Sequence, residues 1–524
     1  MIRLERSHGE RRHATARCRR TSSPRSHTPS SLQTLRCMRS HLLRSKDARK
    51  PRRLSCCKAT GGRVHRRGVL LGLGGAATAA GLAPTTTHGG GALAAPDLQS
   101  CHPPEDLPDT AADVSCCLTY RPGTAIVDFT PPPASSPLCV RPAAHLVDEE
   151  YLAKYERAVA LMKALPDDDP RSFAQQWRVH CAYCNGAYDQ VGFPGLELQI
   201  HSCWLFFPWH RYIKYMHASM HVLSVLPVLP REDHRRRHVR SAVLELDAPG
   251  GMTLPAIYAD QSSPLYDERR NPAHLPQFTL DLDYNGTDDL TISRDQQIDQ
   301  NLRIMYRQPD PGAGTIENTP HNILHFWSGD PRQPNGEDMG NFYSAARDPV
   351  FFAHHGNVDR MWHVWSGLRP GNTAFTDPDW LDASFLFYDE EARPVRVRDC
   401  LDAAALRYTY QDVGLPWLDA RPSAEAGSPE LAADTLPATL SRTVRVAVAR
   451  PGTSRSRGEK EDEEEVLVVE GIEVADCSKF IKFDVFVNQT RSGAATAAAP
   501  ECVGSVALTP HSGRSGKDKG AMKN

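Results

Sequence analysis

Hydrophobic residues recur three or four positions apart in several stretches between residues 146 and 365, which is the period of amphipathic helices. The predicted helices cover 146–165, a stretch after Asp169-Pro170 that includes His180, 208–225, 320–327 and 349–365. Asp148 and Asp348 are candidate N-caps, because an aspartate side chain can accept hydrogen bonds from the first free N–H groups of a helix. Residues 228–300 lack this period, are rich in Pro, Asp and Asn, and are predicted to form long loops.

The pattern changes near the C-terminus to an alternation of hydrophobic and polar residues, which is typical of half-buried strands. Strands are predicted at Val444–Val448, Val466–Val469 and Ile481–Val487, with the acidic run Glu459–Glu465 as a solvated hairpin loop. Residues 419–439 are rich in Ala, Ser, Pro and Glu and are predicted to be a linker. The mature chain should therefore consist of a helical domain at 95–418, this linker, and a β-rich domain at 440–524.

The charge is distributed unevenly along the 524 residues. Met1–Arg67 contains 20 Lys and Arg residues and 3 acidic residues, a net charge of +17, so the remainder carries −19 within a whole-chain charge of −2. This segment is rich in Arg and Ser and has no sustained apolar period, so it cannot bury enough surface to fold alone. The composition is typical of an organelle transit peptide. The alternative is a disordered basic arm that binds nucleic acid.

An uncharged stretch follows the basic segment. It begins after Arg66-Arg67 and ends in Ala92–Ala95, which resembles a small-residue cleavage site. Twin arginines, an apolar run and such a site are typical of a twin-arginine export signal. Pro84 and the neighbouring glycines argue against a membrane-spanning helix. Residues 1–94 are therefore predicted to direct the chain into a chloroplast and on to the thylakoid lumen, and no later segment is predicted to span a membrane.

Histidines form two groups inside the predicted helical domain. The first group is His180, His201 and His210, and the second is His321, His325 and the pair His354-His355. His321 and His325 lie four residues apart, so both rings face the same side of a helix, as a shared metal ion requires. Aromatic residues that would exclude water flank both groups: Trp204, Phe206, Phe207, Trp209, Phe326, Trp327, Phe351, Phe352 and Trp362.

The chemistry of this donor set restricts the metal. Three neutral imidazoles and no carboxylate per ion favour copper over magnesium, calcium or non-haem iron, while zinc remains open. Zinc cannot change its oxidation state, whereas two copper ions can each give one electron to O2. Cys181-x-x-Cys184 by itself is typical of a redox dithiol or half a zinc site, but no second CxxC and no HExxH motif accompany it.

Several motifs, in this order along the chain, resemble the plant polyphenol oxidases, the catechol oxidases and tyrosinases with type 3 copper. They are His180-Cys-Ala-Tyr-Cys184, Leu205-Phe-Phe-Pro-Trp-His-Arg211, Asp348-Pro-Val-Phe-Phe-Ala-His-His-Gly-Asn-Val-Asp-Arg-Met-Trp362, Tyr408-Thr-Tyr410 and Lys482-Phe-Asp-Val485. The resemblance implies a mainly α-helical fold: a four-helix-type dicopper catalytic domain with long loops, then a β-rich, sandwich-like C-terminal domain. It also implies two copper ions per chain.

The resemblance further implies the roles of individual residues. The ligands would be His180, His201 and His210 for copper A, and His321, His325 and His355 for copper B. His355 is chosen over His354 because it stands four residues before Asp359, as in the family. A thioether would join Cys184 to His201, and disulfides would join Cys101 to Cys117 and Cys116 to Cys181. Disulfides suit an exported compartment.

Three more residues acquire roles from the resemblance. Phe342 would be an aromatic gate over the second copper, while Glu317 and Asn322 would hold a water that deprotonates a phenol. The alternative is that Glu317 only caps a helix and Asn322 only orients His321. The pair keeps hydroxylation of monophenols open as a second activity.

The resemblance implies oxidation of o-diphenols to o-quinones with reduction of O2 to water. Small phenols and O2 would be the partners, with no nucleic acid. The C-terminal domain would shield the site, although it ends soon after Lys482-Phe-Asp-Val485, so the domain is expected to be truncated. The alternatives are a dioxygen carrier, a structural zinc protein and an inactive relative.

Overall fold

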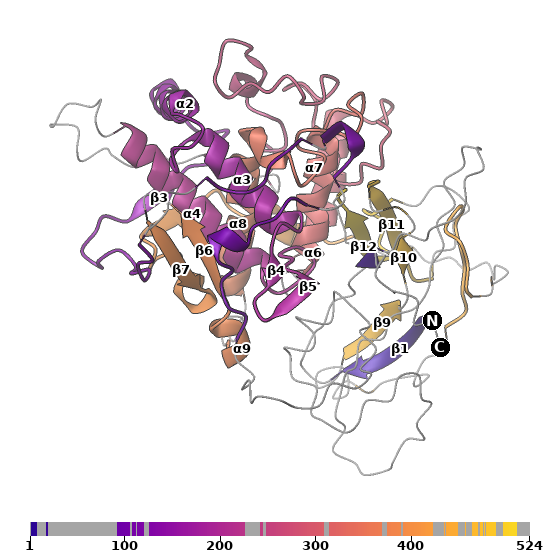
Figure 1. Cartoon of the computed structure of the whole chain (residues 1–524). Helices are drawn as coiled ribbons and strands as arrows, with labels where there is room; N and C mark the ends of the chain where they lie inside the picture. Colours follow the sequence, from indigo (N-terminus) through magenta and orange to yellow (C-terminus); the bar gives the residue numbers. More distant parts are fainter. Residues whose placement is uncertain are drawn as a thin grey trace, which may run out of the picture. The chain divides into compact units, whose positions relative to one another are not determined.

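The computed structural model divides the chain into two compact units, Met1–Ala80 with Pro429–Asp476, and Gly81–Ser428 with Cys477–Asn524. The structure describes residues 2–7, 17–18, 92–104, 107–111, 113–119, 125–225, 242–244, 248–308, 314–368, 375–388, 391–422, 434, 436–448, 456, 464–469, 472–474, 476, 478–488 and 496–510. The predicted twin-arginine signal up to residue 91 and nearly all of the predicted transit peptide lie outside these residues. The second unit holds the helices and both histidine groups (Figure 1).

Three of the predicted helices form the first part of the second unit. They are α2 (Glu149–Ala164), α3 (Phe173–Cys184) and α4 (Phe206–Val225). Asp148 is the N-cap of α2 as predicted, and its side chain accepts a hydrogen bond from the backbone N–H of Tyr151 at 2.8 Å. Ser172 caps α3 in the same way. A polar cap followed by helix-forming residues thus sets where these helices begin.

The other two predicted helices carry the second histidine group. The first consists of α6 (Gly314–Ile316), η5 (Glu317–Asn322) and α7 (Ile323–Ser328), with a kink inside η5. The second is α8 (Val350–Leu368), where the Asp348 carboxylate accepts a hydrogen bond from the N–H of Val350 at 2.8 Å, as expected of an N-cap. Within η5, Thr319 is extended (φ −143°, ψ 121°) and Pro320 follows it, so the helix that carries His321 and His325 begins anew after this kink.

The strands of the second unit form small two-stranded sheets. β3 (Cys139–Arg141) pairs parallel with β8 (Tyr408–Tyr410), while three antiparallel pairs are β4 (Asp189–Gln190) with β5 (Phe193–Glu197), β6 (Ser384–Tyr388) with β7 (Ala392–Arg396), and β11 (Ile481–Phe486) with β12 (Cys502–Leu508). Short helices lie between them: η1 (Leu98–Ser100), η2 (Asp109–Ala111), η4 (Ala256–Ala259), η6 (Ala345–Arg347), α9 (Pro378–Leu381), η7 (Val397–Cys400) and η8 (Pro416–Asp419). The helices therefore carry the core, and the sheets lie around it.

In the first unit, β1 (Ile2–Ser7) pairs antiparallel with β9 (Glu464–Val469), and β2 (Arg17–Cys18) pairs parallel with β10 (Glu473–Val474). The strand predicted at Val466–Val469 is therefore confirmed, as is the one at Ile481–Val487 in the other unit. Val444–Val448 forms no strand, so that prediction was wrong. Alternation supplies a buried face, but a strand also needs a partner for its backbone hydrogen bonds.

In the region predicted as loops, 228–300, the described residues include the short helix η4 and the start of the longer α5 (Arg294–Met305), which the pattern missed. Ser293 and Gln296 form a capping box at its start. The helix is polar over most of its surface and buries few residues, which is why hydrophobic period did not detect it. The capping pair was the available signal.

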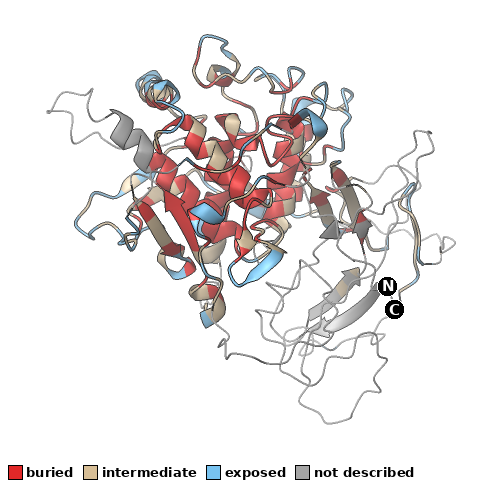
Figure 2. Cartoon of the chain, in the orientation of Figure 1, coloured by how far each residue is buried: buried red, intermediate tan, exposed pale blue. Residues whose placement is uncertain are grey.

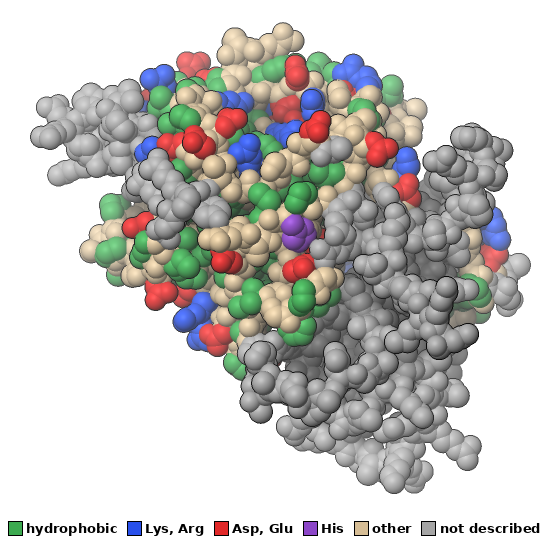
Figure 3. All heavy atoms as spheres, viewed as in Figure 1, with side chains coloured by type: hydrophobic (Ala, Val, Ile, Leu, Met, Phe, Trp, Pro, Cys, Tyr) green, Lys and Arg blue, Asp and Glu red, His purple; other side chains and the backbone are tan. Residues whose placement is uncertain are grey.

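The buried side chains concentrate where α3, α4, η5, α7 and α8 meet (Figure 2). Acidic and basic side chains are interspersed among the described residues on the face in Figure 3, so that face has no field of a single sign. None of the helices in the described part is both long enough and apolar enough to cross a bilayer. The structure is thus mainly helical, with the histidines at the centre of its core.

Candidate metal centre

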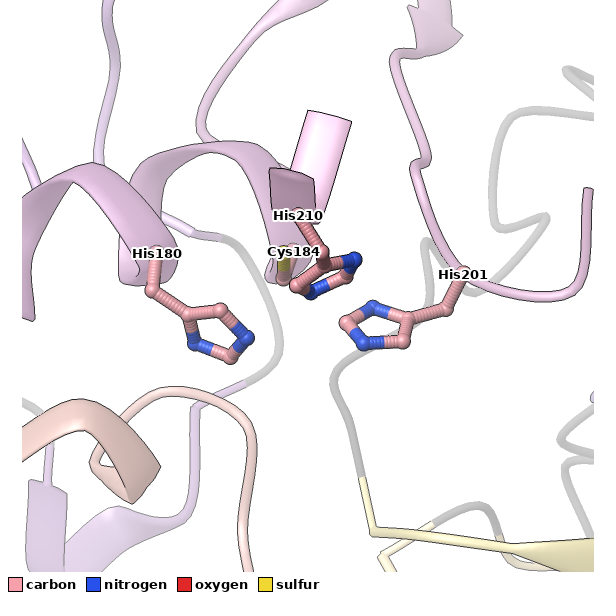
Figure 4. Close-up of side chains that lie close together, drawn as sticks. All are labelled: His180, Cys184, His201 and His210. Atoms are coloured by element: carbon pink, nitrogen blue, oxygen red, sulfur yellow. The ribbon is translucent and has the colours of Figure 1, made fainter. Parts of the chain in front are cut away.

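The first histidine group converges from three separate segments. His180 and Cys184 lie one turn apart on α3, His201 lies in the loop before α4, and His210 lies on α4. One donor atom from each of these four residues lies within 4.8 Å of the others, and all four side chains are buried. Figure 4 shows the three rings facing a common space. The arrangement can hold one metal ion with three nitrogen ligands.

The second group is equally close. Donor atoms of His321, His325, His354 and His355 also lie within 4.8 Å of one another, and all four residues are buried. The Nε2 atoms of His325 and His355 face each other at 3.4 Å. The His355 ring also stacks on the His210 ring at 4.4 Å, so His355 stands where the two groups meet. These positions suit a second ion next to the first.

Backbone carbonyls orient four of the rings through Nδ1. His180 Nδ1 bonds to Phe342 O at 3.0 Å, His210 Nδ1 to Phe206 O at 2.7 Å, His321 Nδ1 to Glu317 O at 3.1 Å, and His325 Nδ1 to Met339 O at 2.7 Å. A carbonyl oxygen only accepts, so each Nδ1 must carry the proton. Each Nε2 then presents its lone pair to the interior, as a metal ligand does.

Three of these four lone pairs lack a hydrogen-bond partner in the part of the chain that the structure describes. The Nε2 atoms of His180, His210 and His321 are buried and have no hydrogen-bond partner among the described residues. Leaving such an atom unpaired costs about 1–3 kcal/mol each. Burial, with help from neighbouring histidines, lowers the pKa of His180 and His321 well below the usual value, and it lowers the pKa of His210 to about 3 and of His325 to about 4. Neutral, unpaired imidazoles fit a metal pair that accepts their lone pairs.

The cysteines near the first group have different states. The structure contains the disulfides Cys101–Cys117 and Cys116–Cys181, which is the pairing that the resemblance implied. Cys184 is buried and unoxidised, and burial raises its pKa well above the usual value. Because Cys181 is already paired, Cys181-x-x-Cys184 does not form a redox dithiol.

Phe342 lies closer to the first group than its expected role implies. Its ring stacks on the His201 ring at 3.8 Å, while the His325 ring is 6.1 Å away. The backbone explains this position, because Phe342 O accepts from His180 and Phe342 N donates to Pro510 O.

The side chains of Glu317 and Asn322 form hydrogen bonds with segments outside their own helix. Glu317 Oε1 accepts a hydrogen bond from Ser202 N at 2.6 Å, in the loop that carries His201, and burial raises the Glu317 pKa to about 8. Asn322 Nδ2 donates to Ala507 O at 2.7 Å, and Asn322 Oδ1 accepts from the Thr509 hydroxyl at 3.0 Å. Glu317 therefore links the two histidine groups, and Asn322 binds the C-terminal segment.

A buried ion pair that the sequence reasoning missed connects the two groups. Arg211 Nε donates to Asp359 Oδ1 at 2.5 Å, and both side chains are almost fully buried. The hydroxyls of Tyr408 and Tyr410 donate to Asp359 Oδ2. Burial alone would raise the Asp359 pKa, but the charges of Arg211 and Arg141 and the two tyrosine hydrogen bonds outweigh it, so the Asp359 pKa is lowered. Arg211 follows His210, and Asp359 lies one turn after His355. The motif Tyr408-Thr-Tyr410 was the available signal for this network.

Comparison with known families agrees with this site. The common central domain of tyrosinase matches residues 250–368, the polyphenol oxidase middle domain matches 374–423, and the chloroplastic polyphenol oxidase C-terminal domain matches 436–524. The second histidine group lies inside the first of these matches.

Relatives and solved structures agree with these family matches. The chain is 47% identical over 509 residues to the chloroplastic polyphenol oxidase of Malus domestica, covering 87% of this chain and 83% of the relative. It is 43% identical to the chloroplastic (+)-larreatricin hydroxylase of Larrea tridentata, covering 88% and 83%. The structure of latent apple tyrosinase is similar with a TM-score of 0.68 and 47% identity, covering 74% of this chain and 89% of that one. The chain therefore belongs to the plant polyphenol oxidases of the type 3 copper family, and its two histidine groups form a dicopper site.

Proposed function

We propose that this chain oxidises o-diphenols to o-quinones at two copper ions, one held by His180, His201 and His210 and the other by His321, His325 and His355. The observation that carries the proposal is the convergence of buried histidine donor atoms in two groups, with the Nε2 atoms of His180, His210 and His321 lacking a hydrogen-bond partner among the described residues. The chain is a copper-dependent oxidase of phenols by its family. When bound there, the copper pair would transfer electrons from the diphenol to O2, and two diphenols would supply the four electrons and four protons that reduce one O2 to two waters.

The chain's own residues would prepare the site in three ways. The backbone carbonyls hold the rings in one tautomer, so the ligands need little reorganisation when metal binds. Phe342 and Phe351 pack on the ligand rings and exclude water. The Arg211–Asp359 pair holds α4 against α8, which keeps the two groups together.

Glu317 and Asn322 support a further step on monophenols. Burial raises the Glu317 pKa to about 8, which places this carboxyl near the range where it can take or give a proton at neutral pH. We propose that Glu317 and Asn322 hold a water that accepts the phenol proton. A relative named as a hydroxylase, at 43% identity, supports this activity.

We also propose a thioether between Cys184 and His201. The Cys184 sulfur is buried within 4.8 Å of a His201 donor atom, and it has no disulfide partner. The bond would fix the His201 ring. A peptide that joins the two residues and has lost two hydrogen atoms would identify it by mass spectrometry.

The chloroplastic relatives support targeting to the chloroplast. We propose that residues 1–94 are removed on the way to the thylakoid lumen, that 95–418 is the catalytic domain, and that 419–439 links it to the domain at 440–524. That last domain would shield the site, which the hydrogen bonds of Asn322 to Ala507 and Thr509 support.

The test is copper content and oxygen uptake of the purified protein with catechol and with a tyrosine-like monophenol. We expect about two copper ions per chain and uptake with catechol. Reversible O2 binding without uptake would indicate a carrier, and zinc in place of copper would indicate a structural site. Loaded copper without uptake, even after protease treatment, would indicate an inactive relative.

A further inference from the structure

Arg141, the last residue of β3, is a buried arginine whose charged end has no hydrogen-bond partner among the described residues. It is 1% exposed, and its Nε, Nη1 and Nη2 atoms all lack an acceptor. Its guanidinium lies 4.2 Å from the centre of the Tyr408 ring and 6.0 Å from that of Tyr410. An aromatic ring attracts the charge from above the guanidinium plane, but the N–H groups lie in that plane. The arginine therefore still needs an acceptor at its edge.

Asp359 does not supply this acceptor, although its charge acts on Arg141. Asp359 Oδ1 accepts a hydrogen bond from Arg211 Nε, and Asp359 Oδ2 accepts from the hydroxyls of Tyr408 and Tyr410. Both oxygens are thus engaged by other donors, and no hydrogen bond from Arg141 reaches them. The carboxylate is shared among three partners before Arg141 is counted.

The charges of this buried group do not balance. Arg141, Arg211 and Asp359 are each at most 2% exposed, and two guanidinium groups against one carboxylate leave one positive charge. Tyr408 and Tyr410 stay neutral, because burial raises the pKa of both phenols above the usual value. A buried charge without a counter-charge is costly, and an arginine cannot escape this cost by losing its proton. Water would satisfy the N–H groups but would leave the charge, whereas a monovalent anion satisfies both.

We propose that Arg141 binds a small monovalent anion, such as chloride, at the edge of its guanidinium. The site lies where β3 pairs with β8, two strands from opposite ends of the catalytic domain. The anion would complete the charge balance of a group that includes Asp359, which follows the proposed ligand His355 by one helical turn. It would thereby stabilise the fold around the metal centre. This inference goes beyond phenol oxidation and does not depend on it.

The surroundings favour a small anion of single charge over sulfate or phosphate. Tyr408 forms an apolar cluster with Ala403 and Leu406, and Phe129 and Tyr215 pack against this cluster. Walls of this kind offer few donors to the several oxygens of a large oxyanion, each of which would need a partner once buried. A second negative charge would also exceed the single positive charge that is left unbalanced.

The first test measures urea unfolding of the full, copper-loaded chain while chloride rises tenfold, from about 20 to about 200 mM. Sodium methanesulfonate replaces sodium chloride, so the ionic strength stays constant. An anion that binds only the folded chain should lower the unfolding equilibrium constant by about three- to tenfold over this range. Arg141→Met removes the charge at similar volume and should lose this response. Arg398→Met, which removes an exposed arginine paired with Asp382, is the matched control and should keep it.

Chloride can also bind copper, but that contribution is common to all three chains. The difference between the original chain and Arg141→Met therefore isolates the proposed site. Equal chloride responses in these two chains would overturn the proposal.

The second test locates the anion without any variant, so it holds even if Arg141→Met does not fold. Crystals of the copper-loaded chain in sodium bromide should show an anomalous peak within hydrogen-bonding distance of the Arg141 guanidinium. Water there, with no bromide, would overturn the proposal. So would a bromide peak combined with equal chloride responses, because it would show binding at crystal concentration only. Failure of the proposed function would appear as absent oxygen uptake, which neither measurement reads.

Discussion

The two histidine groups reach similar geometry by different means. The first group is held by restraints within its own surroundings: the disulfide Cys116–Cys181 next to His180, the Phe342 ring on His201, and Glu317 bonded to the His201 loop. The second group lies on η5, α7 and α8, and the amide of its neighbour Asn322 is hydrogen-bonded to the C-terminal segment. The two groups therefore differ in what surrounds their ligands: a disulfide and an aromatic ring at the first, and the C-terminal segment at the second.

The two groups differ also in how their ligands can be chosen from sequence. No ligand of the first group has another histidine directly beside it in the chain. In the second group, His354 and His355 are adjacent and both buried, and both donor atoms lie within the 4.8 Å cluster. Only His355 faces both His325 and the first group. Mutating His354 and His355 one at a time therefore tests which of them is a ligand of the second group, while the first group stays intact.

The largest effect is expected from His355→Ala. Changes to residues that merely support a ligand cost 10–100-fold in metal affinity or activity, so loss of a ligand should cost more than ~100-fold in oxygen uptake. About half of the copper should also be lost, because the first group is intact. Copper analysis and oxygen uptake with catechol measure both effects. His354→Ala is the matched control and should retain both copper ions, and the reverse result would reassign the ligand.

The second-largest effect is expected from breaking the buried Arg211–Asp359 ion pair, which joins the helices of the two groups. Asp359→Asn leaves the buried Arg211 charge without its partner, which should destabilise the fold by about 3–5 kcal/mol. Denaturant unfolding followed by tryptophan fluorescence measures the loss. The control is Asp382→Asn, which breaks an exposed pair with Arg398 and should cost at most about 1 kcal/mol. Similar losses in the two variants would mean that the buried pair does not join α4 to α8.

The two disulfides test how much covalent bonds near the first group contribute to the free energy of unfolding. Cys116–Cys181 closes a sequence separation of 65 residues, and Cys101–Cys117 closes one of 16. Replacing both cysteines of the longer loop by alanine should cost about 2–4 kcal/mol, and about 1 kcal/mol more than replacing those of the shorter loop. Unfolding midpoints in denaturant compare the two double variants. A larger loss from the shorter loop would show that chain entropy is not what these bonds contribute.

The smallest effect concerns pH and the second group. Asp338 precedes Met339, whose carbonyl orients His325, and burial together with Asp267 raises the Asp338 pKa to about 8. A raised carboxyl pKa means that the folded chain binds more protons than the unfolded chain. Stability from this group is therefore fully present below a pH near 4, falls as pH rises, and stops falling above about 8, by on the order of 1 kcal/mol per pH unit.

Unfolding free energies measured between pH 6 and 8 check this slope. Asp338→Asn cannot ionise and should flatten the profile in that window. An unchanged slope in this variant would assign the pH dependence to other carboxyls, such as Asp267, whose pKa burial raises to about 6.

Much of the local structure follows from the sequence alone. Hydrophobic period and polar caps predicted α2, α3, α4 and α8 within a few residues, because both signals arise from neighbours along the chain. The four-residue spacing of His321 and His325 predicted that their rings would meet, and they lie 4.6 Å apart. The identity of the metal needed the family resemblance, since the spacings by themselves left zinc open.

What only the tertiary structure decided depends on residues far apart in the chain. Adjacent His354 and His355 point about 100° apart on a helix, so only packing against α4 and α7 shows which one reaches the centre. The alternation at Val444–Val448 indicated a strand, but among the described residues only Asp434 forms hydrogen bonds with its backbone, at Arg445, and no strand pairs with it. Arg211 meets Asp359, and Thr509 meets Asn322, across separations of 148 and 187 residues. A sequence specifies which groups can donate, accept or carry charge, whereas the fold determines which of them share a buried space and must satisfy one another.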